Sequence, residues 1–166
     1  FHKGFYLDVG AYHLYKGSLT QNLYKRGWKG MNLDISKSSI DLYNIARPLD
    51  ININCAVSDF NGETNYYENS PINQQNSLKE NNSAKKIEID CFKLNTILEN
   101  YEIKTIDYLN IDVEENDFKV ISTFDFKKFN PSLVSIEFND YEFNNLINSE
   151  INILMEKNNY KLISKF

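Results

Sequence analysis

The 166-residue sequence lacks any long apolar run, because no stretch approaches the roughly 20 residues that a membrane-spanning helix needs. It also lacks an excess of basic residues: 18 lysines and arginines stand against 23 aspartates and glutamates, which gives a net charge of −5. Nucleic-acid binders normally present a basic face. Neither a membrane nor a nucleic acid is therefore expected as a partner.

Cysteine is scarce. Cys55 and Cys91 are far apart and show neither CxxC nor Cys/His ligand spacing, so neither a zinc site nor a disulfide framework is indicated. Two buried thiols in a reducing compartment are the simplest interpretation. Because the visible N-terminus also shows no signal-peptide pattern, the sequence predicts a cytoplasmic protein.

What the sequence has is an alternation of short apolar strands with helical segments. Strands are expected at 4–9, 29–35, 50–58, 62–67, 86–92, 106–114 and 132–138, followed by an extended end at 160–166. Helices are expected at 18–26, 36–46, 94–100, 118–124 and 151–158. This order predicts an α/β fold of the doubly wound type, a mostly parallel sheet with helices on both faces, in a single domain spanning 1–166.

Residues 68–86 interrupt this pattern, because they are rich in Asn, Gln, Ser and Lys. A loop of this length is usually either functional or disordered. Two interpretations stay open at this point, a lid over a substrate and a disordered segment.

Polar residues gather where the predicted strands end. In an open α/β sheet, ligands bind in the crevice beyond the carboxyl ends of the strands. The residues in question, in strand order, are Asp8 and Gly10, then Asp34, then Ser58, then Asp112 and Glu114, and finally Glu137.

The first strand end indicates a nucleoside ligand. Gly10 would let a ligand approach the backbone, and Asp34, which is 24 residues further on, stands where a nucleoside-binding fold needs an acceptor for ribose hydroxyls. A dinucleotide site needs G-x-G-x-x-G, whereas Tyr12 and Tyr15 occupy the second and third glycine places. An NAD-dependent dehydrogenase is therefore disfavoured, and S-adenosylmethionine, a nucleoside without pyrophosphate, fits better.

Four blocks of the sequence resemble the FkbM family of S-adenosylmethionine-dependent methyltransferases. They are "GFYLDVGAYHLYKGSLTQNLYKRGWKGMNLDIS", "NCAVSD", "NTILENYEIKTIDYLNIDVEENDFKVI" and "PSLVSIEF", and together they span nearly the whole chain. The resemblance implies a class I, Rossmann-like methyltransferase. Members of this family generally methylate hydroxyl oxygens, often on sugars or polyketides.

The resemblance also implies which residues bind the cofactor. It places Asp8, Gly10 and Ala11 in the loop under the methionine tail. It makes Asp34, with its neighbour Ile35, the acceptor for the ribose hydroxyls, and it places Ala56, Val57 and Ser58 beside adenine. Asp112 would face the methionine end or the methyl acceptor.

Two positions depart from the family pattern. Tyr12 stands where the family often has Asn, and Glu115 replaces the glycine of the motif Asp-x-Glu-Gly. A turn with positive φ would favour glycine at that place. An alternative therefore stays open, a catalytically inert nucleoside-binding or interaction domain derived from a methyltransferase.

Methyl transfer to a hydroxyl requires that its proton be removed by a base or that a metal raise its acidity. The predicted catalytic residues are His13, Asp112 and Glu137, and the same three are the candidate ligands for Mg²⁺. Strand alternation would place Glu114 on the same side as Asp112. The predicted function is an O-methyltransferase acting on a hydroxyl of a sugar, glycoconjugate or related small metabolite. The sheet is expected to lack its last strand or strands at the C-terminal side, and such an unpaired edge favours a homodimer.

Overall fold

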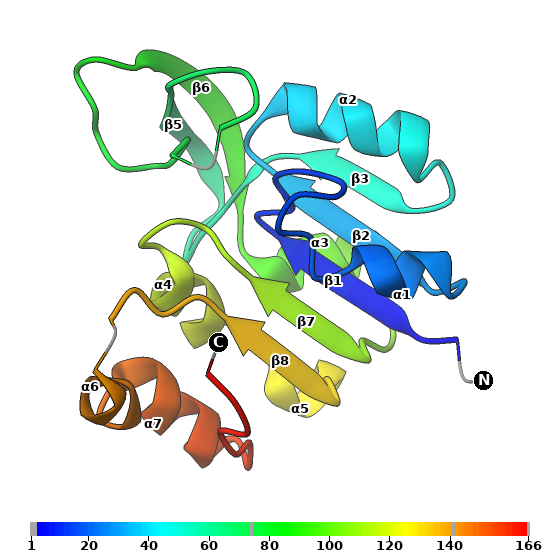
Figure 1. The fold of residues 1–166 in the computed structure, drawn as a ribbon, viewed down its shortest axis with the longest axis vertical. Coiled ribbons are helices and arrows are strands. Elements are labelled where there is room, and N and C mark those ends of the chain that lie inside the picture. Colours follow the sequence, from blue (N-terminus) through cyan, green and yellow to red (C-terminus); the bar gives the residue numbers. More distant parts are fainter. Residues whose placement is uncertain (1–2, 74, 141, 166) are drawn as a thin grey trace.

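The computed structural model describes residues 3–73, 75–140 and 142–165. Its centre is a five-stranded sheet with the strand order β3-β2-β1-β7-β8, in which every neighbouring pair is parallel (Figure 1). In chain order the strands are β1 (Phe5–Val9), β2 (Lys29–Asp34), β3 (Ile51–Asn54), β7 (Tyr108–Ile111) and β8 (Leu133–Ile136). The order reverses direction after β1, so the carboxyl ends of β1 and β7 form the switch point of a doubly wound sheet.

A second, three-stranded sheet extends from the first. It contains β4 (Ala56–Val57), β6 (Lys85–Phe92) and β5 (Gly62–Glu68), with β5 and β6 antiparallel. The single strand expected at 50–58 is therefore wrong, because the chain leaves the main sheet at Cys55 and β4 pairs with β6 instead. In Figure 1 the β5–β6 pair stands above the carboxyl ends of the main strands.

Helices cover both faces of the main sheet, as the sequence predicts. The short helix α1 (Gln21–Lys25) and α2 (Lys37–Ala46) lie over one face (Figure 1). Side chains of α3 (Leu94–Asn100), α4 (Asp117–Ser122), α5 (Phe126–Phe129) and α7 (Glu150–Lys157) belong to the apolar core on the other face. The remaining helix, α6 (Phe143–Ile147), packs beside α7.

The two faces of the sheet differ in chemistry. Leu7 and Val9 of β1 point into the apolar core, where they join Leu109 and Ile111 of β7 and the helix side chains. The alternate residues of both strands point to the other face and include the buried polar groups Asp8 and Asn110. Polar groups removed from water must find partners. The face under α1 and α2 therefore holds a hydrogen-bonded network, whereas the opposite face holds the apolar core.

Several element boundaries differ from expectation. The helix expected at 18–26 covers only 21–25, the strand expected at 106–114 ends at Ile111, and α5 and α6 have no counterpart among the predicted helices. Residues 160–165 form no regular element, and Phe166, the last residue of the expected extended end, lies outside the described residues. Within the described ranges, no helix is long and apolar enough to cross a membrane.

Candidate functional site

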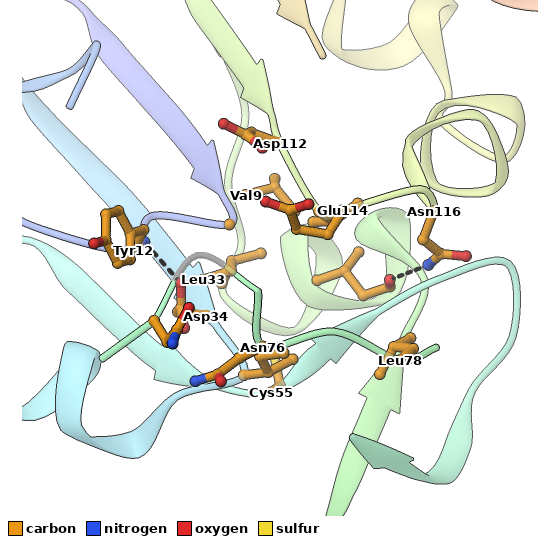
Figure 2. A pocket seen from close by; sticks show the side chains of 15 residues that line it. Val9, Tyr12, Leu33, Asp34, Cys55, Asn76, Leu78, Asp112, Glu114 and Asn116 are labelled. Carbon is orange, nitrogen blue, oxygen red and sulfur yellow. Dashed lines mark hydrogen bonds between the residues drawn. The ribbon is translucent and has the colours of Figure 1, made fainter. Parts of the chain in front are cut away.

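A cleft opens at the carboxyl ends of β1, β2 and β7 (Figure 2). It encloses about 670 Å³ of space counted out to its open mouth, solvent included. Five of the residues implied by the resemblance line it, namely Gly10, Asp34, Ile35, Val57 and Asp112. Tyr12 and Glu114, which the sequence singled out at the first loop and at a strand end, line it too. The sequence carried no signal for the lining residues Val9, Leu33, Asn73, Asn76, Leu78 and Val113.

Asp34, at the end of β2, is fixed by backbone groups on both sides. Its Oδ2 accepts a hydrogen bond from the Tyr12 N–H at 2.7 Å (Figure 2), and its Oδ1 accepts one from the Ser36 N–H at 2.7 Å. The side chain is only 8% exposed. Burial raises its pKa to about 6, although the two backbone hydrogen bonds oppose that rise. At neutral pH Asp34 is therefore an ionised acceptor with lone pairs left for hydroxyl donors.

The neighbouring wall of the cleft comes from the segment around β4. Val57 lines the cleft, whereas Ala56 and Ser58 are buried beside it and line neither this cleft nor the cavity described below. Asn116 connects this wall to the turn after β7, because its Nδ2 donates to the Val57 carbonyl oxygen at 3.0 Å and to Ser58 Oγ at 3.2 Å. The only sequence signal for Asn116 was its place next to the altered Asp-x-Glu-Gly motif.

Part of the segment between β5 and β6 forms another wall. Asn76 and Leu78 line the cleft (Figure 2). The segment is tied to the start of α2, where Ser36 Oγ donates to the Pro71 carbonyl oxygen, and to the turn after β7, where Lys79 pairs with Glu115 at 2.7 Å. The described part of this segment therefore lies against the cleft.

Three carboxylates gather at the ends of β7 and β8. Oxygens of Asp112, Glu114 and Glu137 lie within 4.8 Å of one another. Desolvation and the negative charges of Glu137 and Asp8 raise the pKa of Asp112 to about 6. Because the Asp112 side chain is exposed at the cleft mouth, water offsets part of the desolvation, and repulsion between the carboxylates is the firmer cause.

Glu114 and Glu137 respond to the same crowding. Partial burial, together with the charges of Glu137 and Asp112, raises the pKa of Glu114 to about 7. Burial is also the main cause that raises the pKa of Glu137. Glu137 Oε2 is buried and has no hydrogen-bond partner among the described residues. At neutral pH this cluster holds at least one proton-accepting carboxylate whose pKa lies close to the working pH.

His13 does not join these carboxylates. Its Nδ1 accepts hydrogen bonds from the Tyr15 N–H at 3.2 Å and the Lys16 N–H at 3.1 Å, which fixes the turn after the first loop. His13 lines neither this cleft nor the second cavity, which is described below. The residue that joins Asp112 and Glu137 in the carboxylate cluster is Glu114. Glu114 shares the group through the turn after β7, not through strand alternation, because β7 ends at Ile111.

A second cavity lies on the other side of the first loop. It shares Gly10, Tyr12 and Asp112 with the cleft, and its other lining residues are Asp8, Ala11, Lys16, Gly17, Ser18, Leu19 and Asn110. Asp8 accepts hydrogen bonds from Thr20 Oγ1 at 2.6 Å and from Asn110 Nδ2 at 2.9 Å. Asp112 is thus a lining residue of both cavities.

The two departures from the family motif occupy left-handed backbone. Tyr12 has φ of 46°, and the successive residues Glu114 and Glu115 have φ of 52° and 68°. Non-glycine residues adopt this conformation at a cost of roughly 1 kcal/mol each. The turn that carries the acidic cluster therefore does need the positive φ for which glycine would be suited.

These features define a class of protein: an α/β, Rossmann-like fold with a glycine turn after its first strand and an acidic residue at the end of its second. Comparison with family models finds the methyltransferase FkbM domain over residues 8–162. The chain belongs to the FkbM methyltransferase family. Comparisons with curated proteins and with solved structures find no match.

Proposed function

We propose that this protein is an S-adenosylmethionine-dependent O-methyltransferase that acts on a hydroxyl of a sugar, glycoconjugate or related small metabolite. The observation that carries the proposal is Asp34. Its carboxylate is buried in the cleft wall, held by two backbone N–H groups, and ionised at neutral pH. A fixed, desolvated carboxylate is suited to accept the paired hydroxyls of a ribose.

The rest of the cofactor follows from the position of Asp34. Ile35 and Val57 supply apolar contacts for adenine on one side of the ribose, and the Asn116 amide holds Val57 in place. On the other side, Gly10 and Ala11 lead toward the second cavity, where the methionine tail would lie above Asp8. The bound cofactor supplies a methyl group on a sulfonium, which is already a good leaving group.

The acidic group is placed to act on the acceptor. We assign the role of base to Asp112, because it lines both cavities and its pKa of about 6 allows it to accept a proton at neutral pH. Asp112 would accept the proton that the acceptor hydroxyl loses when it is methylated. Glu137 accepts a hydrogen bond from protonated Asp112 and so stabilises the product state.

Mg²⁺ at this site is a proposed alternative to proton transfer to Asp112, because a carboxylate that holds the cation is no longer the free base. Carboxylate oxygens are the ligands that a hard divalent cation prefers, and the set Asp112, Glu114 and Glu137 offers three within 4.8 Å. A bound cation would lower the pKa of an acceptor hydroxyl. His13 has no place in this ligand set, since its Nδ1 is engaged by the Tyr15 and Lys16 N–H groups.

One observation favours a second candidate function, an inert nucleoside-binding module. Glu115 stands beside the proposed base where the family motif has glycine, and it holds a left-handed backbone that glycine would adopt without cost. The two functions share the Asp34 site and differ at the acidic group. Cofactor binding without methyl transfer to any hydroxyl acceptor would favour the module.

The test is calorimetric titration of the protein with S-adenosylhomocysteine, with and without Mg²⁺. Asp34→Ala is compared with Asp41→Ala, a control that removes an exposed carboxylate of α2 paired with Lys37. We expect micromolar binding that Asp34→Ala weakens at least about 100-fold and Asp41→Ala leaves unchanged. Absence of binding to the wild-type protein in every condition would overturn the proposed function.

A further inference from the structure

Arg47 is a fully buried arginine at the C-terminal end of α2, and the cofactor-binding residues considered so far do not include it. Its guanidinium lies against the rings of Tyr43 and Tyr24, 4.8 and 5.2 Å from their centroids. A buried cation is costly unless hydrogen bonds and nearby negative charge compensate its lost hydration. The groups that hydrogen-bond to the Arg47 guanidinium therefore indicate which part of the protein this side chain holds in place.

Most of these partners belong to the connection between β1 and α1. Arg47 Nη2 donates to the Leu14 carbonyl oxygen at 3.3 Å, to Ser18 Oγ at 3.3 Å and to Gln21 Oε1 at 2.8 Å. Arg47 Nη1 donates to Thr20 Oγ1 at 2.9 Å. The Arg47 side chain thus holds the second half of this connection at Leu14, Ser18 and Thr20, and holds the first residue of α1, Gln21, as well.

The first half of the connection is fixed from the same helix and from the end of β2. Tyr43, one turn before Arg47 in α2, donates its hydroxyl to the Ala11 carbonyl oxygen at 2.8 Å. The Gly10 and Ala11 N–H groups donate to the Leu33 carbonyl oxygen. Residues 10–18, which supply most of the wall of the second cavity, are therefore held in one shape by partners outside the loop.

Thr20 links Arg47 to Asp8 through two hydrogen bonds of its hydroxyl group. The Thr20 hydroxyl accepts from Arg47 Nη1 and donates to Asp8 Oδ2 at 2.6 Å, so it joins the buried cation to the buried carboxylate. Asp8 is 2% exposed, and Asn110 holds its other oxygen. The hydroxyl orients Asp8 and compensates both charges at once.

We propose that Arg47 is a positioning residue that acts through Thr20 to set Asp8 and the loop of residues 10–18 for the methionine end of the cofactor. The identity of the ligand in this proposal rests on the proposed function. The ordering of residues 10–18 does not, because hydrogen exchange measures that ordering without any ligand.

The test compares Thr20→Val with Thr20→Ser. Valine keeps the size of threonine and removes the hydroxyl, whereas serine keeps the hydroxyl and removes only a methyl group. We expect Thr20→Val to weaken S-adenosylhomocysteine binding about tenfold or more, and to speed hydrogen exchange at Gly10, Ala11 and Tyr12 by a similar factor. Thr20→Ser should stay within about threefold of wild type in both measurements.

Two further variants complete the design. Arg47→Met should reproduce the effects of Thr20→Val if it folds, and the threonine pair decides the matter if it does not. Phe129 belongs to α5 and lies in the apolar core on the opposite face of the sheet. Phe129→Leu should lower stability without altering the loop and should bind S-adenosylhomocysteine as wild type does. Normal binding and normal exchange in Thr20→Val would overturn the proposal while leaving the proposed function intact.

Failure of the proposed function can also be distinguished from failure of the positioning role. If the wild-type protein binds no S-adenosylhomocysteine, the proposed function fails, and the exchange data alone decide whether Arg47 and Thr20 order the loop. Faster exchange in Thr20→Val, restored by serine, would then support the positioning role for another ligand, and equal exchange would overturn it.

Discussion

The carbonyl oxygen of Asp112 lies where a side chain on Gly10 would have to be: a Cβ built at Gly10 would stand 1.7 Å from it. The ends of β1 and β7 thus approach each other so closely that only hydrogen fits between them. Gly10 also has φ of 81°, in the left-handed region that favours glycine. The sequence predicts that Gly10 lets a ligand approach the backbone, and the structure shows that the neighbouring strand end approaches it as well.

Gly10→Ala is therefore expected to be far more damaging than alanine at another left-handed glycine. Gly17 has φ of 73° and open space around its Cβ position, so Gly17→Ala tests the backbone conformation alone. We expect a loss of about 1 kcal/mol in the free energy of unfolding for Gly17→Ala and more than about 3 kcal/mol for Gly10→Ala. Urea denaturation measures both, and equal losses would contradict the packing described at Gly10.

Asp34 makes stability depend on pH in a predictable direction. Burial raises its pKa to about 6 in the folded protein, above the ordinary value of about 4, so the folded state binds the proton more tightly than the unfolded state. This contribution favours the folded state most at low pH and is lost as pH rises from about 4 to about 6. The unfolding free energy of wild type relative to Asp34→Asn should therefore fall, by up to about 3 kcal/mol, between pH 4 and pH 8.

Denaturation of both proteins across this pH range provides the measurement, and the difference between them cancels the titration of the other groups. A difference that stays constant with pH would show that Asp34 has an ordinary pKa. Ligand binding should change in the opposite sense, because protonated Asp34 is a poorer acceptor for hydroxyl donors.

Because Glu115 has left-handed backbone, glycine should stabilise the protein more than alanine at this position, the reverse of the order within a helix. Both Glu115→Gly and Glu115→Ala remove the exposed ion pair with Lys79, so their difference reports the backbone at φ of 68°. We expect the glycine variant to be more stable by about 1 kcal/mol. At Lys119, an exposed position of α4, alanine should instead be favoured by about the same amount. The same preference at both positions in thermal or urea denaturation would contradict the left-handed turn.

Asp112→Asn separates binding from chemistry. The variant should bind S-adenosylhomocysteine within about threefold of wild type and should lower the rate of methyl transfer about 100-fold or more, the usual contribution of a general base. Labelled S-adenosylmethionine with a panel of sugar and polyol acceptors provides the assay, and Glu99→Gln, an exposed change on α3, is the control. The wild-type rate should fall as pH drops below about 6 to 7, where the coupled carboxylates take up protons. An unchanged rate in Asp112→Asn would remove Asp112 from the mechanism.

The alternation of strands and helices predicted the parallel sheet, and the polar residues at strand ends predicted the edge where the cleft lies. These features depend on local periodicity and on a topological rule, so sequence suffices for them. The departure of β4 from the main sheet was not predictable, because it depends on pairing between Ala56 and Cys91, 35 residues apart. Asn76 was missed as a lining residue for the same reason, since the distant segment between β5 and β6 brings it to the cleft.

The place of the His13 side chain was not predictable from the sequence either. Its chemistry made it a natural candidate for a base, and its place in a glycine-containing loop strengthened the expectation. The orientation of a loop side chain is decided by local backbone donors, however, and the Tyr15 and Lys16 N–H groups engage its Nδ1. Arg47 was overlooked because an arginine before a proline suggests only a helix end, and its burial becomes visible only in three dimensions.

The most direct test of the central claim is a crystal structure of the protein with S-adenosylhomocysteine. The account predicts ribose hydroxyls within hydrogen-bonding distance of the Asp34 carboxylate, adenine against Ile35 and Val57, and the homocysteine end beside Gly10 and Asp8. A ligand bound away from the cleft, or with its ribose remote from Asp34, would contradict the account.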